Sequence, residues 1–329
     1  MKVTIRDIAR LSDVSVTTVS QIVNNKGHRF SKRTKDKVLK VIEENNYTPN
    51  YFASNIIKNK SCMIGVIMPT MNDPFTYSIV RKMRPILGKS NYHILISESF
   101  GEEEMELELL EKYHQLAVEA ILIFTSHKLP QDLLKKSVYR GTPVIFIDNG
   151  LNKSYFGDIF LSEYQSIYDS VSYLIKKGHQ KIGLIKDRGE TFSFTDRKQA
   201  YLDALSDNKL IVDSTLIKEV TLSIEAGYQA TTEILKEKEV TAILCCDDNI
   251  PIGCYQSIYD SGKVVNRDIE IIGFDGIEFL KQMRPKIKTM HTPFEEFAEI
   301  LSQKIIRAIE YPKEPQDTQH LEMSFKIND

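Results

Sequence analysis

Residues 4–20 read TIRDIARLSDVSVTTVS, a stretch with two helix starts separated by a short break. Thr4 followed by Asp7 is a capping-box-like signal, with Asp in the usual position of Glu or Gln. Asp13 lies in the break, where Asp tolerates the left-handed backbone that a tight turn needs. The apolar residues between these points predict one buried helix face, formed by Ile5, Ile8, Ala9 and Leu11.

A second helix is predicted to begin after Ser15 and to end at about Asn24, with Val19, Ile22 and Val23 facing inward. Its outward side chains are small or polar and include no acid: Val16, Thr17, Ser20, Gln21 and Asn24. Such side chains allow close approach to base edges and phosphates. The alternative is a generic helical bundle with a polar surface.

Two short helices joined by a turn bury too little apolar surface to be stable alone, so a third helix is expected. Ser31 is a suitable N-cap for it, and the helix is predicted to end near Asn45, before Tyr47. Its predicted apolar positions are Val38, Leu39, Val41 and Ile42. The first fifty residues therefore predict a three-helix unit with a helix-turn-helix at its front.

The charge of the chain is unevenly divided. The 329 residues have a formal net charge of −2, but residues 1–60 contain twelve Lys and Arg against five Asp and Glu. The first sixty residues thus carry +7 and the remaining 269 carry −9. A basic head on an acidic body indicates that only the head touches a polyanion such as DNA.

Four segments, residues 4–9, 14–20, 24–25 and 47–50, occur in the order and at the spacing of the lactose-repressor family, whose headpiece this region resembles. The resemblance implies that Val16, Thr17 and Gln21 read bases in the major groove. It also implies a set of hydroxyl and amide groups that hold phosphates: Ser15, Thr18, Ser20, Asn24, Ser31, Thr34, Tyr47 and Asn50.

The same resemblance implies a hinge helix within residues 49–60, in which Ala53 and Ile56 of each subunit meet the minor groove. A wedge of this kind unstacks a base step and kinks the duplex. This chain departs from the family at Gln21, where Arg is usual, and Gln reads adenine better than guanine. It also departs at Ile56, where Leu is usual.

Beyond residue 61 short apolar runs alternate with helical stretches. The predicted strands are 63–68, 93–96, 120–124, 143–147, 181–185, 241–244 and 269–274, and helices are predicted at about 74–90, from 102, and at 163–177. Such alternation predicts a parallel sheet covered by helices on both faces. Two sets of about five strands predict an α/β core of two doubly wound subdomains with a ligand cleft between them, similar to periplasmic sugar-binding proteins.

Ligands of open parallel sheets bind beyond the carboxyl ends of the strands. That rule selects Asn72, Phe75, Asp148, Ser193, Arg197, Asp247 and Asp275. The family resemblance implies effector contacts for the last five of these and for Thr292. Carboxylates and amides bind hydroxyl groups, Arg supplies a donor fork, and aromatic rings cover sugar C–H surfaces. Asp73 and Asp248 are expected instead to cap the helices that follow them.

The sequence contains no GxSxG, HExxH or GxxxxGK[ST] motif, so no enzymatic activity is expected. The acids could form a glycosidase pair, but the family resemblance explains them without catalysis. The cysteines, Cys62, Cys245, Cys246 and Cys254, form no CxxC pair, so reduced thiols and no metal or cofactor are expected. Neither a long apolar segment nor a signal-peptide pattern is found, which favours a cytoplasmic protein.

These observations predict a headpiece at 1–48, a hinge at 49–60 and a core at 61–329. Within the core, an N-subdomain is expected at about 61–160 and 290–320, and a C-subdomain at about 161–289 and 321–329. The predicted function is a homodimeric repressor of a carbohydrate operon that binds a palindromic operator and is released by a sugar or sugar phosphate. Alternatives are a corepressor response, a sugar-binding protein without DNA binding, and a regulator that senses a partner protein.

Overall fold

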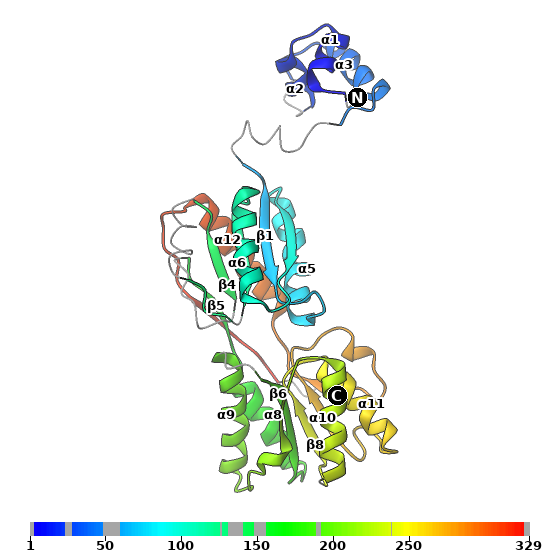
Figure 1. Ribbon diagram of the computed structural model, residues 1–329, viewed down its shortest axis with the longest axis vertical. Coiled ribbons are helices and arrows are strands. Elements are labelled where there is room, and N and C mark those ends of the chain that lie inside the picture. Colours follow the sequence, from blue (N-terminus) through cyan, green and yellow to red (C-terminus); the bar gives the residue numbers. More distant parts are fainter. Residues whose placement is uncertain are drawn as a thin grey trace. The chain divides into compact units, whose positions relative to one another are not determined.

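The computed structural model describes residues 3–23, 28–48, 60–125, 127–130, 141–147, 156–188, 192–237 and 239–325, with the backbone alone for 192–195 and 237. The chain forms two compact units, Met1–Ser61 and Cys62–Asp329 (Figure 1). Among the described residues, none of the helices has the length and hydropathy that a membrane span requires.

The first unit contains the predicted three helices, α1 (Ile5–Ser12), α2 (Val16–Val23) and α3 (Lys32–Glu44). The capping box at α1 is present, because the side chains of Thr4 and Asp7 each bond to the other's backbone N–H. Asp13 follows α1 in the left-handed conformation, with φ 53° and ψ 49°, as its position in the break predicts. Buried Ile8, Ala9, Val19, Ile22 and Val38 form the core of this unit.

Two predicted core positions of this unit are wrong. Leu11 is 51% exposed and Leu39 is 52% exposed. In α1 the buried face passes through Ile8 and Ser12, one turn apart, and the Ser12 hydroxyl donates to the Ile8 carbonyl at 2.6 Å. Leu39 follows buried Val38 directly, so it lies about 100° around the helix from the core-facing side.

The second unit begins with β1 (Met63–Met68), α5 (Pro74–Lys89), β2 (His93–Glu98), α6 (Glu103–Gln115), β3 (Ala120–Phe124), β4 (Val144–Ile147) and β5 (Ile159–Ser162). It continues with α8 (Tyr164–Lys176), β6 (Ile182–Asp187), α9 (Phe192–Asp207), β7 (Ile217–Val220), α10 (Ile224–Glu237), β8 (Ala242–Cys245) and α11 (Ile250–Asp260). The last elements are β9 (Glu270–Gly273), β10 (Lys288–Thr289), α12 (Phe294–Glu310) and β11 (Gln319–Glu322). Every strand and helix predicted here and described by the structure is present, with ends shifted by up to two residues.

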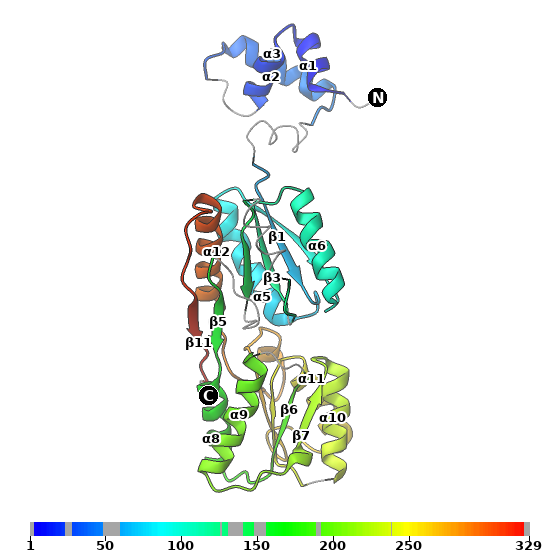
Figure 2. The same ribbon diagram turned by 60° about the vertical axis from the view of Figure 1, so that its left-hand side comes forward.

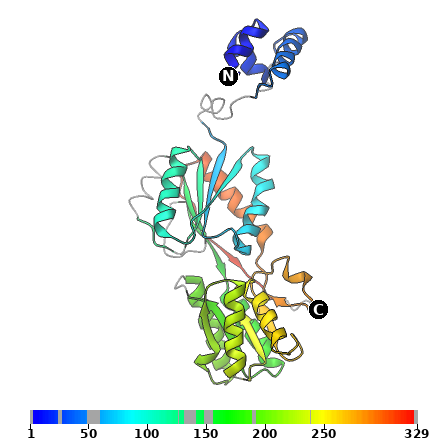
Figure 3. The same cartoon turned by 45° about the vertical axis from the view of Figure 1, so that its right-hand side comes forward.

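The strands form two sheets, with the orders β11-β5-β4-β3-β1-β2 and β10-β9-β8-β6-β7, and all strand pairs are parallel. Helices cover both faces of each sheet (Figure 3). In the first sheet, β1 lies between β2 and β3, and in the second, β6 lies between β7 and β8. Both sheets therefore change winding direction next to their first strand, and such a switch point is where α/β sheets bind ligands.

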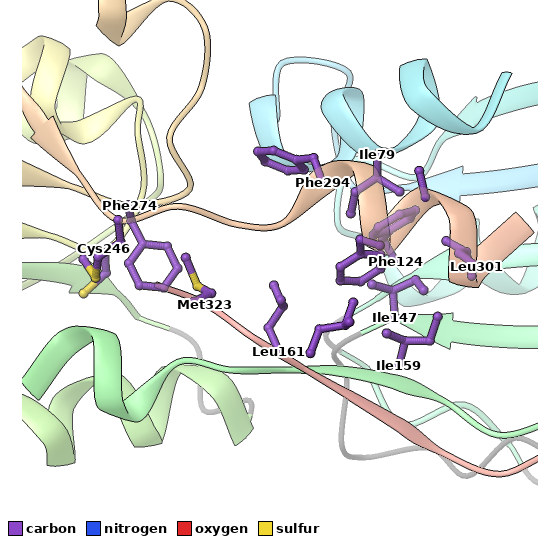
Figure 4. Close-up of a cluster of buried hydrophobic side chains, with 14 of the residues drawn as sticks. Ile79, Phe124, Ile147, Ile159, Leu161, Cys246, Phe274, Phe294, Leu301 and Met323 are labelled. Carbon is purple, nitrogen blue, oxygen red and sulfur yellow. The ribbon is translucent and has the colours of Figure 1, made fainter. Parts of the chain in front are cut away.

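The sequence did not predict the strands β5, β7, β10 and β11. Of these, β5 and β11 run beside each other between the two lobes (Figure 2). They span the expected subdomain boundaries at 160 and 320. Leu161 of β5 and Met323, just after β11, belong to one buried cluster with Phe124 of the first lobe and Phe274 of the second (Figure 4). The apolar core is thus continuous from one lobe to the other.

Candidate functional site

The face of α2 that the sequence selects for base contacts is accessible. Val16 is 41% exposed, Thr17 is exposed, and Ser20 and Gln21 are half-buried. Val19 and Ile22, between them, are buried in the head core. The helix therefore presents an acid-free surface on the unit that carries the excess of positive charge.

Hydroxyl groups gather at the starts of α2 and α3. Ser15 Oγ accepts a hydrogen bond from the Thr18 N–H at 3.1 Å, and Ser31 Oγ accepts one from the Thr34 N–H at 3.2 Å. Each serine hydroxyl also lies 2.9 Å from the threonine hydroxyl. Helix N-termini with hydroxyl groups are suited to binding phosphates.

Tyr47 packs against the core of the head, and burial raises the pKa of its hydroxyl. Five predicted site residues lie outside the described part of the chain, so their roles stay predictions: Asn24, Asn50, Ala53, Ile56 and Asp148. Ser193 lies in α9, where the structure describes the backbone alone.

In the second unit, Arg197 of α9 is the centre of a buried polar cluster. Its Nε and Nη2 donate to Glu163 Oε2 and Oε1 at 2.5 and 2.6 Å, and its Nη1 donates to the Cys246 carbonyl at 2.8 Å. The guanidinium stacks over the ring of Phe274, with Cζ 4.0 Å from the centroid. Burial alone would lower the pKa of Arg197, but the Glu163 carboxylate raises it, so the guanidinium stays charged.

Asp247 and Asp248 follow β8, and the structure does not assign the helix cap to the residue that the sequence predicts. Asp247 Oδ1 accepts from the N–H groups of Asn249 and Ile250 at 2.6 and 3.2 Å, so Asp247 is the residue that binds the start of α11. The prediction that Asp248 caps this helix is wrong. Asp248 accepts from the N–H groups of Phe274 and Ile277 at 2.7 and 2.8 Å, and so joins the loop after β9 to β8.

The approach of Asp248 to β9 explains a glycine at the end of that strand. A Cβ at Gly273 would overlap Asp248 Oδ1. Thr289 of β10 donates to the same oxygen at 3.0 Å. Asp248 is fully buried, and its pKa is raised to about 8 by burial, against hydrogen bonds that favour the ionised form. It is therefore a structural residue of the second lobe.

Asp275 follows β9 with φ 79° and meets Thr292 from the segment before α12. Thr292 Oγ1 donates to Asp275 Oδ1 at 3.0 Å, and the Thr292 N–H donates to the Asp275 carbonyl at 3.1 Å. Both residues are buried. Burial raises the pKa of Asp275, the Asp248 carboxyl raises it further, and Arg197 opposes the shift.

The first lobe contributes Asp73, which caps α5 as expected by accepting from the Phe75 and Thr76 N–H groups at 3.0 and 3.1 Å. Its carboxylate also acts electrostatically on Asp247 and Arg197 of the second lobe. Asn72 is exposed. The ring of Phe75 is half-buried and lies 6.0 Å from that of Phe294 in α12, so it is packed within the first lobe.

The structure thus brings four predicted effector residues into one cluster: Arg197, Asp247, Asp275 and Thr292. Sequence reasoning missed Glu163, which immediately follows β5. The rule that selects residues beyond strand ends would have included Glu163 if β5 had been recognised.

Comparison with known proteins identifies the two units. Residues 4–50 match the family model of bacterial regulatory proteins, lacI family, and residues 171–327 match that of the periplasmic binding protein-like domain. The NTD biosynthesis operon regulator NtdR of Bacillus subtilis is 31% identical over 93% of this chain and 92% of its own length. The ribose operon repressor of Haemophilus influenzae is 27% identical over 97% and 96%.

Solved structures show the same fold. A Lac repressor dimer bound to operator and the anti-inducer ONPF matches 98% of this chain and 97% of its own, with a TM-score of 0.80 and 23% identity. A LacI family regulator from Enterococcus faecium with bound ribose matches 80% of this chain and 96% of its own, with a TM-score of 0.71 and 22% identity.

The chain belongs to the lacI family of bacterial regulatory proteins, and is a DNA-binding transcription regulator. The relatives named here are regulators, not enzymes.

Proposed function

We propose that this protein is a homodimeric, cytoplasmic repressor whose affinity for a palindromic operator is set by a small sugar-like effector. Val16, Thr17 and Gln21 contact bases, and the hydroxyls at the starts of α2 and α3 hold phosphates. The acid-free, exposed face of α2 on a positively charged unit is the observation that carries this proposal. Two heads related by two-fold symmetry read two half-sites.

The effector binds at the Arg197 cluster, with Asp247, Asp275 and Thr292 as hydrogen-bonding groups. Relatives support a sugar-like ligand, since they include a ribose operon repressor and a ribose-bound regulator. The cluster combines Asp73 of the first lobe with residues of the second lobe. A ligand bound there therefore has different affinities for different arrangements of the two lobes. We assign the acids to binding, not to catalysis.

A matched pair of variants tests the DNA-binding face. Val16→Glu places a negative charge on the exposed face of α2, where Val16 is 41% exposed, and Leu39→Glu places the same charge on α3, where Leu39 is 52% exposed. A duplex selected by the full-length protein from random DNA should be bound with strong salt dependence. Val16→Glu should abolish preference for this duplex over random DNA, and Leu39→Glu should retain it. Equal loss in both variants contradicts the assignment of α2.

A further inference from the structure

The charge balance of the Arg197 cluster narrows the chemistry of the effector, given the site assigned under the proposed function. Arg197 is the cation that contacts the cluster among the described residues, and Glu163 holds it by two hydrogen bonds. Nearby Lys186 on β6 is buried and lies 3.5 Å from Glu219 Oε1, an oxygen that the half-exposed Lys198 also approaches, at 3.4 Å. The charge of Arg197 is therefore balanced within the protein by Glu163, and Lys186 is directed toward Glu219.

The carboxylates of the cluster differ in how many of their oxygens accept hydrogen bonds from the protein. Glu163 is engaged at both oxygens by Arg197, and Asp248 is engaged at both oxygens by backbone N–H groups. Asp247 and Asp275 each receive hydrogen bonds at Oδ1 alone from the described residues. Both side chains are more than nine-tenths buried, with exposures of 4% and 7%. Each of these buried side chains thus keeps one carboxylate oxygen, Oδ2, without a donor among the described residues.

We propose that the effector is a polyhydroxylated molecule bearing a protonated amine, such as an amino sugar, and that Asp247 and Asp275 bind its amine and adjacent hydroxyls. A buried carboxylate that lacks a counterion is costly, and a ligand cation removes that cost. An anionic ligand would be disfavoured at this site. It would approach several carboxylates, and the one guanidinium beside them is already neutralised.

Glu163 is the residue that makes the site prefer a cationic ligand over an anionic one. Without its charge, Arg197 would offer an unbalanced positive group beside the site, which suits a phosphate or carboxylate ligand. The substitution Glu163→Gln preserves the shape of the side chain and one acceptor oxygen. It should therefore shift the site toward anionic ligands without removing Asp247 or Asp275.

Thermal-shift and calorimetric titrations of the full-length protein with matched probes test the proposal. The probes are glucose, galactose and mannose, each as the free sugar, the 2-amino sugar, the N-acetylated amino sugar and the 6-phosphate. At least one amino sugar should bind about tenfold tighter than its neutral and N-acetylated counterparts. Asp247→Asn and Asp275→Asn should abolish this preference, and Glu278→Gln, an exposed control on the same lobe, should keep it.

Glu163→Gln should weaken amino-sugar binding and strengthen binding of the matching phosphate. If neutral or phosphorylated probes bind as tightly as amino sugars, the inference is wrong and the sugar-like effector site stands. If no probe of any charge binds to protein that still binds its operator, the inference and the effector assignment both fail.

Discussion

Glu163 and Arg197 form a two-point ion pair, with N–O distances of 2.5 and 2.6 Å, in which the two side chains are 1% and 9% exposed. Glu163 lies between β5, one of the strands that cross between the lobes, and α8 of the second lobe. Arg197 in turn donates to the carbonyl of Cys246, the residue directly after β8. The pair therefore fixes the position of the guanidinium relative to the loop that carries Asp247.

Removing one partner of this pair should be strongly destabilising. Glu163→Ala leaves the buried guanidinium without a counterion, and we expect a loss of about 3–5 kcal/mol in the free energy of unfolding of the core. The control is Glu278→Gln, whose pair with Lys281 at 3.0 Å is 75% and 51% exposed. This control should lose less than about 1 kcal/mol. Urea titrations of the two variants and the wild type measure both losses. Similar losses in both variants would show that burial does not govern the Glu163 pair.

Asp248 should be required for order in the loop after β9. Asp248→Ala leaves the buried N–H groups of Phe274 and Ile277 without an acceptor, at a cost of about 1–3 kcal/mol each. Hydrogen exchange should show loss of protection at these two amides. Asp260→Ala, which removes one exposed hydrogen bond from Tyr228, serves as the control. Unchanged protection of Phe274 and Ile277 in Asp248→Ala would refute this role.

Asp247 should make the stability of the core depend on pH. Burial first, and then the Asp73 carboxylate, raises the pKa of Asp247 from 3.8 to about 6, against the opposing effect of Arg197. Because the folded state binds this proton more readily than the unfolded state, the stabilisation is complete below pH 3.8 and is lost as pH rises through about 6. Asp248 and Asp275 titrate in the same cluster, so the comparison must be made between variants.

Asp247→Asn removes this charge and keeps an oxygen that can bind the start of α11. We expect the variant to gain about 1–3 kcal/mol relative to the wild type at pH 7.5, and little at pH 4. Denaturant titrations at the two pH values measure the difference. An equal effect of the substitution at both pH values would contradict the raised pKa. Under the proposed function, the wild-type protein retains a destabilising carboxylate because its ligand needs it.

The sequence was sufficient where a local rule determines the structure. The capping box of Thr4, the turn at Asp13 and the apolar strands β1, β3 and β4 follow from short-range chemistry. It was insufficient where tertiary context decides. In β11, Leu321 is buried and Gln319, His320 and Glu322 are exposed, so this edge strand lacks an apolar run.

At the site, too, the sequence could not predict which of Asp247 and Asp248 binds the start of α11. Adjacent aspartates after a strand are equivalent by position, and which one caps α11 depends on where β9 and β10 place their donors. The Arg197–Glu163 pair joins residues 34 positions apart and depends on β5, which has a short and alternating pattern of burial. No pattern within either segment specifies that contact.

One titration determines whether effector binding at the Arg197 cluster controls DNA binding by the head. Full-length wild-type protein and Asp275→Asn are titrated into a fluorescent operator duplex, with and without the sugar that gives the largest thermal shift. We predict that the sugar changes the wild-type Kd by about 5- to 150-fold and leaves that of Asp275→Asn unchanged. A wild-type Kd that is the same with and without a sugar known to be bound would show that the Arg197 cluster does not control the head.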